Sequence, residues 1–124
     1  MGNSPSGGSF WWNPATHADR RPLLLARNAV ERAIRADFDA HGFTEVHCAS
    51  LQVSPGNETH LHALAVDVTG DDGETRRRHL HTSPEFSMKK LIAAGETKIF
   101  DFARVWRNRE GGDRHAIEIG RAHV

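Results

Sequence analysis

Two short segments carry residue types that together could bind an ammonium group and a phosphate. Thr82-Ser83-Pro84-Glu85 joins an expected strand to an expected helix, which would hold the Glu85 carboxylate rigidly within reach of a substrate ammonium. Arg107 ends another expected strand and precedes a basic loop that closes with Arg114-His115. Guanidinium groups bind phosphate oxygens in pairs, so this strand and loop could hold a triphosphate. Either segment alone is common in ordinary proteins, but the two in this order are informative.

Histidines are a second candidate for chemistry, because the chain contains nine of them. His60-x-His62 and His79-x-His81 would each place two imidazoles on one face of a strand, and paired strands could gather all four. Zinc accepts imidazole ligands, but the sequence has a single cysteine and no HExxH helix. We therefore interpret these residues as histidines on strand surfaces and predict no metal site.

Three consecutive arginines, Arg76-Arg77-Arg78, resemble a phosphate-binding patch. Successive side chains of a strand point to opposite faces, so the three would not act together. Charged residues on an edge strand also prevent pairing with other chains. We interpret this segment as the solvated edge of a hairpin.

The elements that would position these residues predict an α+β fold with a largely antiparallel sheet. A flexible leader over 1–21 precedes a helix over 22–41, which has Pro22 in its first turn and Gly42 just after its end. A second helix begins at Ser83-Pro84-Glu85, with Ser83 as its cap, and ends at Gly95. The expected strands are 43–49, 61–68, 75–81 and 98–106, and a loop over 69–74 joins the second and third as a hairpin.

Composition narrows the class of protein. Sixteen basic and 16 acidic residues give a formal net charge of zero, which argues against a dedicated nucleic-acid binder. The single cysteine, Cys48, excludes a disulfide framework. No apolar run approaches the roughly 20 residues that span a bilayer, and no secretory signal is present. These features predict a cytoplasmic protein that does not bind membranes.

In order and at family spacing, several stretches resemble the N-terminal part of the catalytic domain of class II lysyl-tRNA synthetases. The resemblance is strongest to the short paralogues that attach (R)-β-lysine to elongation factor P, because only about 20 residues precede the first helix. A full synthetase has an anticodon-binding OB domain there. The stretches that carry the resemblance, between about Trp12 and His115, are Leu24-Leu25-Ala26-Arg27, His41 to Val46, His81 to Leu91, Ala94-Gly95 and Phe102 to Asn108.

This resemblance implies an ATP-dependent ligase of the class II synthetase type. Lysine or (R)-β-lysine would be activated as the adenylate, with Mg²⁺ bridging the phosphates, and transferred to a lysine of elongation factor P. A lysyl-tRNA synthetase fragment that acts on tRNA-Lys is the alternative, and a non-catalytic dimerising domain is a second one. The helix over 22–41 and the strand over 43–49 correspond to motif 1, so the intact protein is expected to be a homodimer.

The resemblance also implies roles for individual residues. Ser83, Pro84 and Glu85 would line the amino-acid site, with Glu85 binding a substrate ammonium. Arg107 would be the motif 2 arginine, a catalytic residue that holds the α-phosphate and stabilises charge in the transition state. The ATP-binding set implied in this way is Arg107, Asn108, Arg109, Arg114 and His115.

Four features depart from the family pattern. Ala49 replaces the motif 1 proline, Arg109 stands where motif 2 commonly has a glutamate, and Ala116 replaces an asparagine. The fourth is the tail, because Glu118 to Val124 matches what the start of a common sequencing adapter would encode. We therefore expect 22–116 to be the N-terminal part of the catalytic domain and 117–124 to be non-native. Without the second motif 2 strand and motif 3, strand 98–106 would have an unpaired flank and the chain itself would be inactive.

Overall fold

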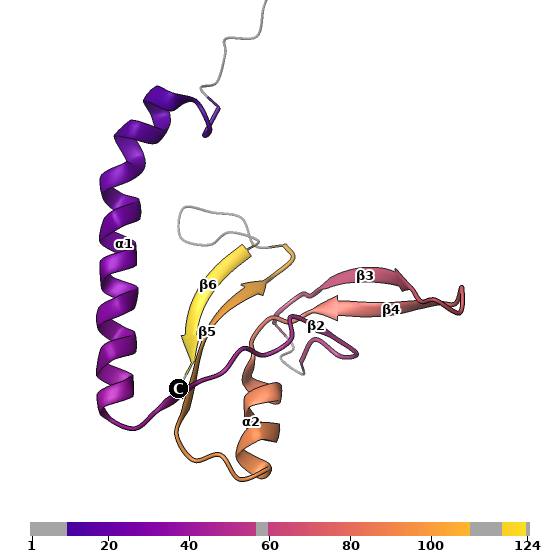
Figure 1. The fold of residues 1–124 in the computed structure, drawn as a ribbon. Helices are drawn as coiled ribbons and strands as arrows, with labels where there is room; N and C mark the ends of the chain where they lie inside the picture. Colours follow the sequence, from indigo (N-terminus) through magenta and orange to yellow (C-terminus); the bar gives the residue numbers. More distant parts are fainter. Residues whose placement is uncertain (1–9, 57–59, 110–117, 124) are drawn as a thin grey trace, which may run out of the picture. The chain divides into compact units, whose positions relative to one another are not determined.

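The computed structural model describes residues 10–56, 60–109 and 118–123 (Figure 1). They divide between two compact units, Met1–His41 and Gly42–Val124. The first unit contains one helix, α1, and the second contains the remaining elements. In chain order the elements are α1 (Pro14–Ala40), β1 (Thr44–Glu45), β2 (Leu51–Gln52), β3 (Leu64–Thr69), β4 (Thr75–Leu80), α2 (Glu85–Ala93), β5 (Ile99–Trp106) and β6 (Glu118–His123).

Helix α1 begins at Pro14, eight residues before the predicted start, so the placement of Pro22 in the first turn was wrong. The reason is a better cap upstream. The Asn13 side chain accepts a hydrogen bond from the Ala15 amide at 3.0 Å, and Pro14 fits the first helical position, where no amide donor is needed. Pro22 lies inside the helix. The predicted end is confirmed, because Gly42 follows the C-cap with a φ of +78°.

The predicted apolar stripe of α1 is present, but no residue of this helix is buried. Leu23 is 74% exposed and Val30 is 57% exposed. Glu31 forms i,i+4 ion pairs with Arg27 at 3.9 Å and with Arg35 at 3.6 Å, and such pairs stabilise a helix only weakly. Most apolar side chains of α1 are therefore exposed.

Strand β5 is the centre of the second unit, which confirms the strand predicted at 98–106. It pairs in parallel with β1 through Ile99 and Phe100, and antiparallel with β6 from Asp101 to Trp106. The expected unpaired flank was therefore wrong. Strand pairing uses main-chain groups that almost any sequence provides, so the non-native origin of the tail stays a prediction. The buried apolar residues of the unit are Met88, Ile99, Phe100, Ala103 and Val105.

The strand predicted at 43–49 is reduced to the two residues of β1. The Val46 amide still bonds to the carbonyl of Phe100 at 2.9 Å, but the Cys48 amide donates to the Asp101 side chain at 3.1 Å instead. The Cys48 amide thus bonds to a side chain rather than to a main-chain carbonyl of β5, and the ladder of β1 does not continue. Strand β2, which pairs with the end of β4, was not predicted.

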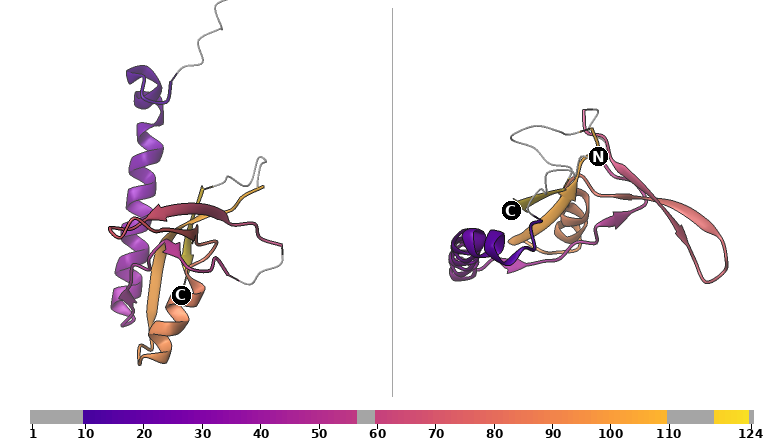
Figure 2. Two further views of the ribbon diagram at one scale, coloured as in Figure 1. Left: turned by 90° about the vertical axis from the view of Figure 1, so that its right-hand side faces the viewer. Right: turned by 90° about the horizontal axis from the view of Figure 1, so that it is seen from above.

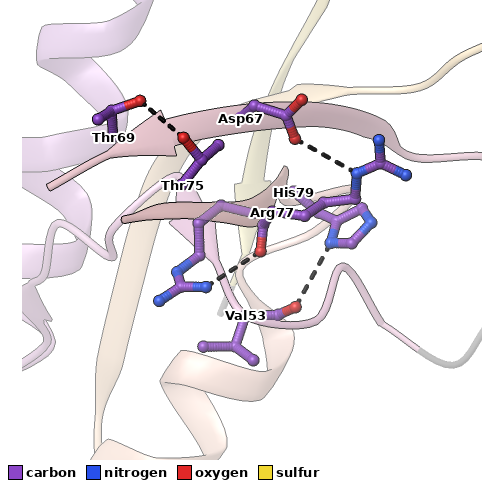
Figure 3. Close-up of polar contacts among 7 residues, drawn as sticks. Val53, Asp67, Thr69, Thr75, Arg77 and His79 are labelled. Atoms are coloured by element: carbon purple, nitrogen blue, oxygen red, sulfur yellow. Dashed lines mark hydrogen bonds and ion pairs between the residues drawn. The ribbon is translucent and has the colours of Figure 1, made fainter. Parts of the chain in front are cut away.

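Strands β3 and β4 form the predicted hairpin, with Thr69 opposite Thr75, and extend away from β5 and α2 (Figures 1 and 2). Figure 3 shows the polar contacts of one face, where the Thr69 and Thr75 hydroxyls lie 3.0 Å apart and Arg77 Nε lies 3.4 Å from Asp67 Oδ1. Arg76 pairs with Asp72 instead. The arginines thus belong to a solvated hairpin, as predicted.

Helix α2 begins at Glu85, with Pro84 as its N-cap residue. Pro84 was predicted inside the first turn and Ser83 as the cap. The Ser83 hydroxyl does accept a hydrogen bond from the Glu85 amide, at 3.2 Å. Ser83 itself, however, lies one residue before the N-cap position that was predicted for it. Gly95 ends the helix as expected, with a φ of +122°. Its amide bonds to Ile92 at 3.0 Å, as in a Schellman motif.

Candidate functional site

The two segments singled out in the sequence come together at the end of β5. His81, which follows β4, accepts a hydrogen bond at its carbonyl from the Trp106 amide at 3.1 Å. The residues that come next on each side are Thr82 to Glu85 and Arg107. The expected amino-acid-binding segment and the expected phosphate-binding arginine therefore each follow a residue of the same main-chain hydrogen bond, His81 and Trp106.

A cavity of about 240 Å³ lies beside the first segment. Ser83 and Glu85 line it, as do Pro55 and Gly56. Gly56 has a φ of +130°, and a side chain at this position would meet the Thr82 hydroxyl at 3.5 Å. Pro84 does not line the cavity and is fully buried. Its place in the site is thus to fix the backbone between Ser83 and Glu85.

Glu85 is half-exposed and lies on the first turn of α2. Its carboxylate oxygen lies 2.6 Å from the Lys89 ammonium, one turn further along the helix, and both side chains line the cavity. The carboxylate is thus already in contact with an ammonium group of the protein itself. An ammonium ligand is the type of group that this carboxylate would bind.

Arg107 lies directly after β5 and is half-buried. Its Nε is buried and has no hydrogen-bond partner among the residues that the structure describes. An unsatisfied buried donor is costly. The phosphate-binding role expected for Arg107 stays a prediction.

Asn108 and Arg109, which directly follow Arg107, are exposed. The Asn108 amide donates to the carbonyl of His62 at 2.6 Å, and the Asn108 side chain accepts from the Arg109 amide at 2.9 Å. Arg109 has a φ of +60°, an unusual value for a residue other than glycine. Arg114 and His115 lie outside the described residues, so their expected roles stay predictions.

His81 is the main feature that the sequence analysis misjudged. It was interpreted as a surface histidine but is only 2% exposed. Its Nε2 lies 2.7 Å from the carbonyl oxygen of Arg104. A carbonyl only accepts, so Nε2 carries the proton. The only available signal was position, because His81 lies between a strand and the Thr82 to Glu85 segment.

Cys48 and Asp101 form a polar pair beside a second cavity of about 250 Å³, which His81 also lines. Asp101 is 3% exposed. Burial, and then the hydrogen bond and charge of Asp101, raise the pKa of Cys48 to about 11. The thiol is therefore protonated near neutral pH and is a poor nucleophile.

This pKa predicts slow alkylation of Cys48. At pH 8, iodoacetamide should react roughly 100-fold more slowly with the folded chain than with the chain in urea, because thiolate decreases tenfold per pKa unit. Replacing Asp101 with asparagine should increase the folded rate several-fold, since burial remains. The measurement is the alkylation rate by mass spectrometry. Equal rates with and without urea would contradict the prediction.

In the described parts of the chain, no three histidine, cysteine or acidic side chains gather as metal ligands. His79 lies opposite Ala65 rather than near His60 and His62. Over the same residues, no helix has the length and apolar character needed to cross a membrane.

Comparisons with known proteins identify a family to which this chain is similar. A family model described as "tRNA synthetases class II (D, K and N)" matches residues 14–121. The elongation factor P–(R)-β-lysine ligase of Haemophilus ducreyi is 34% identical over 109 residues, which cover 87% of this chain and 32% of the relative. The homologue of that ligase in Aquifex aeolicus is 39% identical over 97 residues, covering 78% and 33%. The chain thus spans about a third of the length of these relatives.

Proposed function

The chain belongs to the class II tRNA synthetases of the D, K and N group, and we propose that the whole protein activates lysine or (R)-β-lysine with ATP and transfers it to a lysine of elongation factor P. The relatives named above are ligases of this type. The observation that carries the proposal is the main-chain contact between His81 and Trp106. It joins the segment that borders the cavity at Glu85 to the end of β5, which Arg107 follows.

In the proposed reaction, a carboxylate oxygen of the amino acid attacks the α-phosphorus of ATP, and the bond to pyrophosphate breaks. The amine of the acceptor lysine then attacks the acyl carbon and AMP leaves. Glu85 holds an ammonium of the substrate, and Arg107 binds the α-phosphate and the negative charge that develops on it. The family uses ATP and Mg²⁺ in general, and the ion neutralises phosphate charge when bound.

The proposal favours a protein as the acceptor. Basic and acidic residues are equal in number, whereas surfaces that bind nucleic acid usually have a basic excess. The exposed arginines of the hairpin are offset by Asp67 and Asp72. Transfer to tRNA-Lys is the alternative, because the matched family includes lysine synthetases.

The test uses a full-length protein that contains these residues. Exchange of labelled pyrophosphate into ATP should depend on lysine or (R)-β-lysine, and the acyl group should then appear on elongation factor P rather than on tRNA-Lys. Transfer to tRNA-Lys alone would support the synthetase alternative. A stable dimer that shows no exchange with either amino acid would contradict the proposed function and favour a non-catalytic dimerising domain.

A further inference from the structure

Lys89 contacts the same carboxylate that the proposed function assigns to the substrate. Its Nζ lies 2.6 Å from Oε1 of Glu85, and both side chains line the cavity of about 240 Å³. The free protein thus places an ammonium of its own where a substrate ammonium is expected. Phe86 lines the same cavity and gives it an apolar wall.

The contact between these two side chains is one that a ligand can replace. Lys89 is 65% exposed and Glu85 is 51% exposed, so separating them leaves neither charge buried and unpaired. Exposed pairs of this kind contribute little to stability. Lysine also has a long flexible side chain with a strongly hydrated ammonium, which can move into solvent when another cation takes its place.

We propose that Lys89 competes with the substrate ammonium for Glu85. This inference rests on the proposed function and deepens it. When a ligand ammonium binds Glu85, the Lys89 charge remains nearby and repels it, which weakens binding of any simple amine. Only a ligand that makes further contacts, as an amino acid does through its carboxylate and second amine, then binds tightly enough.

The chain offers a matched control for this proposal. Lys90 lies on the same helix, is exposed, and does not line the cavity. Lys89→Gln and Lys90→Gln therefore remove the same charge from neighbouring positions. Lys89→Arg keeps the charge and should behave like the unaltered chain. Far-UV circular dichroism of each variant shows whether the fold is retained.

The experiment follows the carboxyl carbon of Glu85 by NMR in the full chain labelled with ¹³C at glutamate, while L-lysine or n-butylammonium is added. In Lys89→Gln, the concentration that gives half of the chemical-shift change should be about two- to tenfold lower for both probes, because a competing and repelling charge has been removed. Lys90→Gln should leave it unchanged.

The proposal would be overturned if the concentration that gives half of the chemical-shift change were equal in the unaltered chain and in Lys89→Gln, or if Lys89→Gln showed no shift. A higher concentration in Lys89→Gln would also overturn it, because Lys89 would then assist binding. These outcomes are independent of pyrophosphate exchange. If exchange fails while Lys89→Gln still binds amines more tightly, the proposed function fails and the competition at Glu85 stands.

Discussion

Replacing Arg107 with lysine is expected to lower the rate of adenylate formation about 10²- to 10³-fold in a full-length protein that contains this chain. Arg107 lies directly after β5 and is half-buried, and the proposed function gives its guanidinium the α-phosphate. Lysine keeps the charge but has one compact ammonium in place of a planar fork. The loss should therefore appear mainly in kcat, where charge develops on the α-phosphate.

Arg104→Lys is the matched control for this change. Arg104 belongs to β5, three residues before Arg107, and its side chain is exposed. Pyrophosphate exchange should therefore remain within about twofold of the unaltered rate, since exposed substitutions are usually mild. Exchange by Arg107→Lys at a rate similar to that of Arg104→Lys would refute the role given to Arg107.

Local signals allowed most elements of the fold to be predicted. Gly42 and Gly95 mark the ends of the two helices, and both adopt the positive φ that a helix C-terminus favours. The hairpin followed from its glycine-rich turn and alternating strands. The start of α1 was missed because two prolines, Pro14 and Pro22, both fit a first turn. The better cap at Asn13 decided between them.

Interactions between distant residues account for what could not be predicted. The early end of β1 depends on Asp101, which is 53 residues away from Cys48 and accepts its amide. In the candidate site, Glu85 and Arg107 were singled out from the chemistry of their side chains and their order, and their roles stay predictions. The contact that brings their segments together involves His81, whose burial no local pattern reveals.

His81 is accordingly a position where a single change should affect stability strongly. His81→Ala is expected to lower the free energy of unfolding of the second unit by about 3 kcal/mol. The imidazole is almost fully buried, donates to the carbonyl of Arg104 at 2.7 Å, and lies with its ring centre 6.1 Å from that of Trp106. Truncation removes this donor and leaves a cavity beside β5.

Urea unfolding of the full chain measures this effect, and His79→Ala is the control. His79 is half-buried, and its ring nitrogen lies 3.4 Å from the carbonyl of Val53 (Figure 3), too long for a strong hydrogen bond. Its loss should cost less than about 1 kcal/mol. Equal effects of the two alanine variants would show that burial of His81 adds nothing to stability.

The variant His81→Gln distinguishes the contribution of the hydrogen bond to stability from that of the imidazole ring. The amide nitrogen of glutamine can approach the place of Nε2 and donate to Arg104, but it does not fill the space of an imidazole next to Trp106. His81→Gln should therefore recover about half of the stability lost in His81→Ala. Because the backbone of His81 holds the Glu85 segment against Trp106, the same order should hold for binding of lysine at Glu85. If glutamine is no better than alanine, the ring and not the hydrogen bond holds the two segments together.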